Sequence, residues 1–168
     1  TRAPAQWPHG AANGSCASYH YVMDRQRSAS EAARELGLDV EMCVGSAHKT
    51  AEHVLAILRN YEADSRPKVY ITVAGRSNAL SGFVDGAVSS PVIACPPPSE
   101  TFALADIWSS LRMPSGVAPA VVVEPANAAL LAAKILALTD SSLREKVGAF
   151  QKAQAEKILA DNQELKGK

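Results

Sequence analysis

The stretch KVYITVA, residues 68–74, decides the fold class of this chain. Valine, isoleucine, tyrosine and threonine dominate it, which is typical of a β-strand, and the polar loop AGRSN at 74–78 follows directly. The same arrangement occurs earlier, where the strand-like segment Leu38–Val44 leads into the polar loop GSAHKT at 45–50. Two strands that each end in a polar loop predict that the loops meet at one edge of a parallel sheet.

Helix-like segments and further short strands follow one another along the rest of the chain. Apolar residues recur at helical spacing, and Gly37 is placed to cap the end of the first helix. The predicted helices are Ser28–Leu36, Thr50–Ala63, Asn127–Leu138 and Leu143–Gln163, and the remaining predicted strands are Pro91–Cys95 and Ala120–Val123. Strands that alternate with helices predict an α/β fold, a three-layer αβα sandwich around a parallel sheet.

The N-terminal part departs from this plan. A sheet of this class normally opens with an apolar strand, yet Thr1–Gly14 carries prolines and glycines and no run of β-branched residues. We therefore expect residues 1–27 to be an irregular or atypical segment, and residues 28–168 to form the folded domain. A length of 168 residues predicts one domain overall.

Composition narrows the class of protein. The chain holds 17 basic and 17 acidic residues, so no general positive field would attract nucleic acid or an anionic membrane. No apolar run approaches the ~20 residues that span a bilayer, and we expect no membrane association. The cysteines, Cys16, Cys43 and Cys95, lack the spacing of a disulfide framework or a zinc site, which favours a reducing, cytoplasmic location.

The loop at 45–50 carries the strongest chemical signal. Backbone N–H groups at the start of the following helix can hold an anion, and Lys49 can pair with a phosphate or carboxylate, helped by Thr50 as a cap. The imidazole of His48 can act as a base near neutral pH. The alternatives are an exposed structural histidine and a solvated lysine, so the residues alone leave both interpretations open.

Other chemistry-bearing residues have plainer interpretations. His53 lies one turn after His48, but no third ligand stands at a metal-binding spacing, so we predict an exposed residue and no metal site. Cys95 has no basic neighbour in sequence and is expected to be a small buried residue rather than a nucleophile. For Trp108 and Met113 we favour a subunit contact over a ligand wall.

Four motifs occur in an order that resembles the aminoimidazole ribonucleotide carboxylases of purine synthesis. They are GSAHKTA at 45–51, AGRSN at 74–78, ACPP at 94–97 and DIWSSLRMPSG at 106–116. Lys49 and the Arg76-Ser77-Asn78 loop resemble the second class of this family, which uses carbon dioxide directly. The resemblance implies a flavodoxin-like three-layer sandwich and a homo-oligomer, a tetramer or octamer.

The resemblance also implies a reaction and its residues. The ring carbon of aminoimidazole ribonucleotide attacks carbon dioxide, and the histidine matched by His48 removes the proton from that carbon. Neither ATP, a metal nor any other cofactor is implied. The substrate-binding residues that the motifs imply are Ser46 and Lys49 for phosphate and ribose, and Gly75, Ser77 and Asn78 for the carbon dioxide and imidazole end.

The opening of the chain differs from the family pattern. Family members carry a Gly-Ser-x-Ser-Asp turn, whereas the nearest match here, Gly14–Ser18, has Ala17 and Ser18 at its last two positions, so only Ser15 carries over as a substrate contact. Two alternatives remain open: the carbamate mutase of the first class, and a non-catalytic oligomer with a degraded substrate turn.

Overall fold

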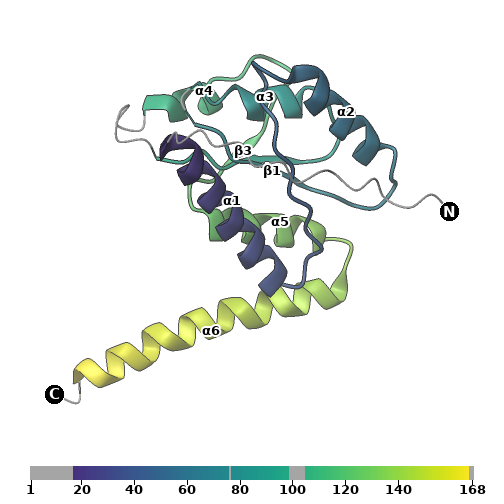
Figure 1. Cartoon of the computed structure of the whole chain (residues 1–168). Helices are drawn as coiled ribbons and strands as arrows, with labels where there is room; N and C mark the ends of the chain where they lie inside the picture. Colours follow the sequence, from purple (N-terminus) through teal and green to yellow (C-terminus); the bar gives the residue numbers. More distant parts are fainter. Residues whose placement is uncertain (1–16, 76, 99–104, 167–168) are drawn as a thin grey trace.

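The structure is a computed structural model that describes residues 17–75, 77–98 and 105–166. Its sheet contains three parallel strands in the order β1-β2-β3 (Figure 1). The strands are β1 (Tyr70–Thr72), β2 (Val92–Ala94) and β3 (Ala120–Val121), each shorter than the predicted run that contains it. Ile93 pairs with Ile71 on one side and with Ala120 on the other, which confirms the predicted parallel arrangement.

Helices connect the strands and account for most of the described chain. Their bounds are α1 (Ala17–Glu35), α2 (Ala51–Glu62), α3 (Ala79–Asp85), the 3₁₀ turn η1 (Ala105–Ile107), α4 (Trp108–Leu111), α5 (Pro125–Leu136) and α6 (Ser141–Lys166). The sequence patterns predicted α2, α5 and α6 to within a few residues. They did not predict α3, a seven-residue helix with a glycine in its interior, because so short a segment shows little periodicity.

The helices form two layers, one on each face of the sheet, as Figure 1 shows. On one face, Ala128 and Ala132 of α5 pack against Val73 and Ile93, and α1 lies beside α5. On the other face, side chains from α2 and α3 pack against β2 around Val92. These layers confirm the predicted three-layer αβα sandwich, and the fold is flavodoxin-like.

Helix α1 begins earlier than the sequence predicted. The expected helix started at Ser28, but α1 already runs from Ala17, so residues 17–27 are helical and not irregular. Apolar periodicity is weak over this part because Asp24, Arg25 and Arg27 interrupt it, while packing against α5 stabilises the helix. Gly37 ends α1 as predicted: its φ of +87° is readily adopted by glycine, and its N–H donates to Arg34 O.

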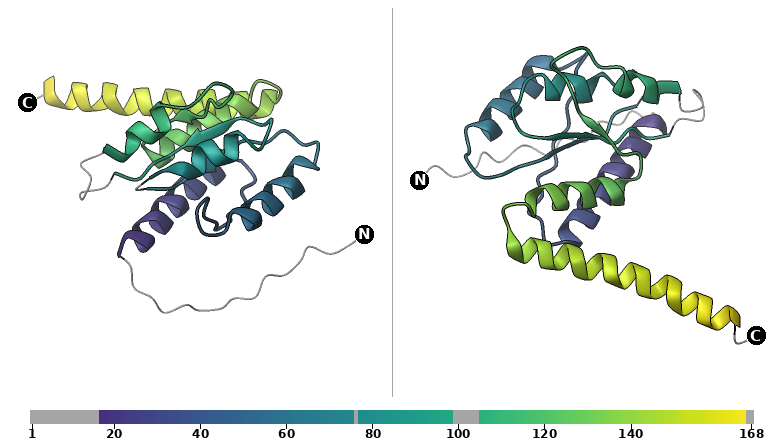
Figure 2. Two further views of the ribbon diagram at one scale, coloured as in Figure 1. Left: turned by 90° about the horizontal axis from the view of Figure 1, so that it is seen from above. Right: turned by 180° about the vertical axis from the view of Figure 1, so that it is seen from behind.

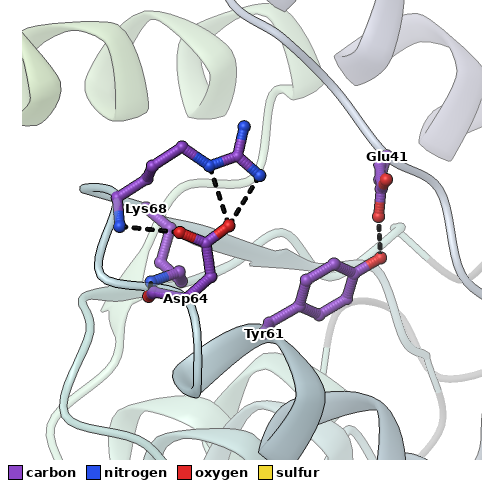
Figure 3. Close-up of polar contacts among 5 residues, drawn as sticks. Glu41, Tyr61, Asp64 and Lys68 are labelled. Carbon is purple, nitrogen blue, oxygen red and sulfur yellow. Dashed lines mark hydrogen bonds and ion pairs between the residues drawn. The ribbon is translucent and has the colours of Figure 1, made fainter. Parts of the chain in front are cut away.

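The segment Leu38–Val44 does not form the predicted strand. The segment is irregular chain and pairs with no strand of the described residues. Side chains contact it instead: Gln26 donates to Cys43 O at 3.1 Å, and the Tyr61 hydroxyl donates to the Glu41 carboxylate (Figure 3). A strand requires a neighbouring strand for its backbone bonds, and β-propensity alone does not supply one.

Helix α6 extends away from the rest of the molecule (Figure 2). Its first turns pack on α5 through Leu143 and Val147, the two residues of the helix that are buried. Towards its C-terminal end, Ile158, Leu159 and Leu165 are 61–75% exposed. Within the described ranges, none of the helices is both long and apolar enough to cross a lipid bilayer.

Candidate active site

Two loops that the sequence placed at one sheet edge meet in the structure. The loop between Val44 and α2 brings His48 to the loop that follows β1, and the His48 Nε2 atom lies 3.4 Å from the Ser77 hydroxyl oxygen. That hydroxyl can donate to an unprotonated Nε2 or accept from a protonated one, and both residues are exposed. The predicted convergence of the two polar loops is therefore observed.

The loop at 45–50 is held by its own hydrogen bonds. The Ser46 N–H donates to the Thr50 hydroxyl at 2.9 Å, and the Lys49 N–H donates to the Ser46 hydroxyl at 3.2 Å. Thr50 is the N-cap of α2, but its side chain makes no capping bond to the helix, so the predicted side-chain cap is wrong. The hydroxyl bonds back into the loop instead and fixes the turn that presents His48.

Gly45 allows this loop to lie against α2. A Cβ atom at this position would lie 2.5 Å from the Val54 Cγ2 atom, and Val54 is buried. A side chain at position 45 would therefore displace either the loop or a stiff β-branched residue of the core.

Asn78 anchors the second loop. Its φ of 44° is left-handed, a conformation that asparagine tolerates better than most residues, and it forms the N-cap of α3. The side chain is 1% exposed, and its amide nitrogen donates to the Ser110 hydroxyl of α4, which also contacts Ser81. The Asn78 Oδ1 atom is buried and accepts no hydrogen bond within the described part of the chain.

A cavity of about 550 Å³ opens beside both loops. Five of the sequence-predicted site residues line it: Ser46 and His48 from the first loop, and Gly75, Ser77 and Asn78 from the second. Lys49 is exposed and does not line this cavity. Ser15 and Arg76 lie outside the described residues.

Nearby ionisable groups are engaged in structural contacts. Burial, followed by contacts with Cys43 and Glu41, raises the pKa of Tyr61 above its ordinary value, so this phenol stays protonated near neutral pH. Burial also raises the pKa of the Cys95 thiol, which is 0% exposed and donates to Val123 O. The prediction that Cys95 is a small buried residue is confirmed.

No cluster of three metal-ligating side chains is found in the ranges that the structure describes. His53 is exposed on α2, as predicted. Trp108 is 61% exposed, while the Met113 sulfur packs near Gly82.

The two loops together offer an imidazole, hydroxyl groups and backbone amides to a ligand. This set of groups is suited to proton transfer and hydrogen bonding.

The contact between Asn78 and Ser110 was not predicted from the sequence. Ser110 belongs to the motif at 106–116, for which the sequence suggested a subunit contact or a ligand wall. Neither the serine pair at 109–110 nor the loop that contains Asn78 shows a periodic pattern that would predict a contact between Ser110 and Asn78. The buried network of Asn78, Ser81 and Ser110 forms where α3 packs against α4, and this packing joins residues that are about 30 positions apart.

Comparison with known proteins agrees with these motifs. A family model described as AIR carboxylase matches residues 18–157. A phosphoribosylaminoimidazole carboxylase of Treponema denticola is 57% identical over 141 residues, covering 84% of this chain and 88% of that protein. One of Archaeoglobus fulgidus is 51% identical over 144 residues, covering 86% and 79%.

The fold agrees as well. The crystal structure of Treponema denticola PurE superimposes with a TM-score of 0.84 at 54% identity, covering 86% of this chain and 91% of that one. Sequence match, fold and the meeting of the two motif loops lead to one conclusion: this chain belongs to the AIR carboxylase family.

Proposed function

We propose that the protein carboxylates 5-aminoimidazole ribonucleotide with carbon dioxide, without ATP, to give 4-carboxy-5-aminoimidazole ribonucleotide in purine biosynthesis. The observation that carries this proposal is the contact between His48 and Ser77 at the cavity of a chain that belongs to this family. The Treponema and Archaeoglobus relatives are both phosphoribosylaminoimidazole carboxylases, which supports the same activity.

The chemistry assigns His48 the proton transfer. The electron-rich ring carbon of the substrate forms a bond to the carbon of carbon dioxide and still carries its hydrogen. His48 Nε2 removes that hydrogen as a proton, and the electron pair of the broken C–H bond restores the aromatic ring. In the reverse direction, the protonated imidazole returns the proton and carbon dioxide leaves.

The neighbouring residues hold the substrate in this proposal. Ser77 orients the imidazole through its hydroxyl, and Gly75 leaves room for the reacting carbon at the cavity wall. Asn78 presents its buried Oδ1, which accepts no hydrogen bond from the described residues, to the exocyclic amine of the substrate. Ser46 and Lys49 receive the phosphate and ribose, while Ser15 stays a predicted contact.

The direct test is an assay with aminoimidazole ribonucleotide and bicarbonate. We expect formation of the carboxylated product by the wild-type chain and a loss of about 10²–10⁴-fold in kcat for His48→Asn. A wild-type rate equal to that of His48→Asn would contradict the proposal. Faster turnover of the carbamate isomer than of aminoimidazole ribonucleotide with carbon dioxide would assign the mutase reaction instead.

We also propose that copies of the chain associate through α6 and that the protein works in the cytoplasm. The exposed apolar side chains of Ile158, Leu159 and Leu165 lie on a helix that extends from the body, and exposed apolar area of this kind favours association. The double variant Ile158→Glu/Leu159→Glu should lower the mass measured by light scattering, whereas Lys157→Glu, on the same helix, should not.

The proposed cytoplasmic location agrees with the state of the cysteines. The exposed free thiol of Cys43 suits a reducing compartment.

A further inference from the structure

Asn78, Ser81 and Ser110 form a closed ring of hydrogen bonds, which we call the serine ring. The Asn78 side-chain nitrogen donates to the Ser110 hydroxyl, the two serine hydroxyl oxygens are 3.3 Å apart, and the Ser81 hydroxyl donates to Asn78 O at 3.3 Å. All three residues are buried, and the ring lies where α3 packs against α4. Bulk water therefore does not compete for these contacts.

The number of hydroxyl hydrogens gives the serine ring one direction. Each serine hydroxyl has a single hydrogen to donate. A carbonyl oxygen can only accept, so the Ser81 hydrogen points to Asn78 O, and the hydrogen between the two serines comes from Ser110. The Ser110 oxygen then accepts from the Asn78 side chain, and only the amide nitrogen of that side chain can donate.

A reversed amide would break the serine ring. If the Asn78 Oδ1 atom faced Ser110, two oxygens with no hydrogen between them would meet in a buried place, which is unfavourable. The backbone adds to this restraint, because the Asn78 N–H donates to Gly75 O at 3.5 Å and the Asn78 carbonyl accepts from Ser81. The ring thus fixes which end of the amide is turned away from Ser110.

Asn78 carries the effect of the serine ring to the cavity. Of the three ring residues, Asn78 alone lines the cavity, and it follows Ser77, whose hydroxyl oxygen lies 3.4 Å from His48 Nε2. The end of the amide that the ring leaves over, Oδ1, is buried and accepts no hydrogen bond from the described residues. A buried acceptor without a donor is unfavourable, so a ligand that supplies an N–H group there gains affinity.

We propose that Ser110 and Ser81 are positioning residues that set the selectivity of the site for an amino-substituted imidazole. They act through Asn78: the serine ring holds its amide so that the oxygen, and not the NH₂ group, is offered to the exocyclic amine of the substrate. This inference rests on the proposed carboxylase function. It gives the motif at 106–116 a role in substrate selection that is exerted from outside the cavity.

Binding of two ligands to the full chain tests this selectivity. The ligands are aminoimidazole ribonucleotide and imidazole ribonucleotide, which lacks the amine, and isothermal titration calorimetry without bicarbonate measures both affinities. We expect the wild-type chain to bind the amino ligand at least about tenfold more tightly, the scale of one hydrogen bond to a buried group. Equal affinities of the wild-type chain for the two ligands would overturn the proposal.

Removing the Ser110 hydroxyl should reduce this preference. In Ser110→Ala the amide nitrogen loses its acceptor, so the amide is no longer held in one orientation and its NH₂ group can face the substrate amine. We expect the affinity ratio to fall to about threefold or less, through weaker binding of aminoimidazole ribonucleotide. Equal weakening of both ligands, with the ratio kept, would show a merely structural role and contradict the proposal.

Ser81→Ala tests the direction of the serine ring from the other helix. Without the Ser81 hydroxyl, the Ser110 hydrogen is free to bond to the Asn78 Oδ1 atom, so the reversed amide is no longer excluded. The affinity ratio should therefore fall as it does in Ser110→Ala. A Ser81→Ala variant that keeps the wild-type ratio would contradict the proposed direction of the ring.

Ser90→Ala is the matched control. The Ser90 hydroxyl donates to Glu62 at 2.9 Å, and Ser90 is half-buried and does not line the cavity. This variant also loses a structural hydrogen bond, but it should keep the wild-type affinity ratio. A comparable fall of the ratio would assign the effect to lost stability and overturn the proposal. If neither ring variant shows a cooperative thermal transition, the wild-type ratio decides.

The carboxylation assay separates this inference from the proposed function. A wild-type chain that carboxylates aminoimidazole ribonucleotide, with an unchanged affinity ratio in the folded ring variants, would contradict only the role of the serine ring. A wild-type chain that neither binds nor carboxylates aminoimidazole ribonucleotide would overturn both.

Discussion

The His48 imidazole and the Ser77 hydroxyl, which are 29 residues apart in the chain, lie 3.4 Å from each other. Ser77 lies in the loop that follows β1, and His48 lies in the loop that precedes α2. The tertiary packing of these two loops therefore creates the pair. Its chemical consequence is that one hydroxyl group can fix the orientation of an imidazole ring, a group that is able to accept and release a proton near neutral pH.

Removing the hydroxyl should affect turnover less than removing the imidazole. We expect Ser77→Ala to lower kcat by roughly tenfold, the scale of one hydrogen bond, and His48→Asn to lower it by about 10²–10⁴-fold. Steady-state kinetics with aminoimidazole ribonucleotide and bicarbonate measure both. His53→Asn, an exposed change on α2, is the control. A larger loss for Ser77→Ala than for His48→Asn would refute the assignment of the proton transfer.

Asn78 should be needed for both its backbone and its side chain. Asn78→Ala strains a left-handed position and removes the hydrogen bond that the Asn78 amide donates to Ser110, so we expect a loss of about 1–3 kcal/mol in the free energy of unfolding. Asn78→Gly keeps the conformation and loses only the amide, so it should cost less. Urea denaturation measures both values. Equal losses would show that the φ of 44° carries no strain.

Gly45→Ala should destabilise the protein through its contact with Val54. The new Cβ atom would lie 2.5 Å from Val54 Cγ2, and overpacking of this kind costs about 1–3 kcal/mol. The double variant Gly45→Ala/Val54→Ala removes the clash, so its loss of stability should be smaller than the two single losses added together.

A second glycine provides the control for Gly45. Gly148 lies within α6 and has no atom within 4 Å of an added Cβ, so Gly148→Ala should raise stability by roughly 0.5–1 kcal/mol. Additive losses at positions 45 and 54 would place the cost of Gly45→Ala in the backbone and not in the packing.

Glu62 should make stability sensitive to acid. Burial acts to raise its pKa, but hydrogen bonds from the Ser90 and Tyr70 hydroxyls and the Ser89 N–H outweigh burial and hold the pKa below its ordinary value of 4.5. Because the folded state binds the proton less tightly than the unfolded chain, the stabilisation is present above pH 4.5 and is lost as the pH falls through the folded-state pKa.

Thermal melts across the acid range test this linkage. Wild-type melting temperature should fall below pH 4.5 more steeply than that of Glu62→Gln, which carries no titrating carboxylate at this position. Glu145→Gln, an exposed change on α6, should keep the wild-type profile. Parallel profiles for wild type and Glu62→Gln would show that the contacts with Ser90 and Tyr70 contribute nothing to the pH dependence.

The fold class and the two motif loops could be predicted because their signals are local. The run at 68–74 is β-branched and aromatic over a length that suits a strand, and α2 repeats its apolar residues at helical spacing. Gly37 was predicted as a helix end because glycine readily adopts a positive φ, and its φ is +87°. Each of these features depends on residues that are near one another in the chain.

Other features depended on partners far along the chain. Leu38–Val44 has the alternation of a strand but finds no described strand beside it, and residues 17–27 have weak periodicity but become helical against α5. The contact of Asn78 with Ser110 joins a loop to helix α4, and no periodicity links the two.

By itself the sequence determined the class of fold, most helices and the position of the two polar loops, since propensity, capping and apolar spacing act over a few residues. Only the tertiary structure decided which strand-like segment is paired, how Asn78 is held and that His48 meets Ser77. Backbone pairing and side-chain packing join residues distant in sequence, and their free energy exists only once the layers have assembled.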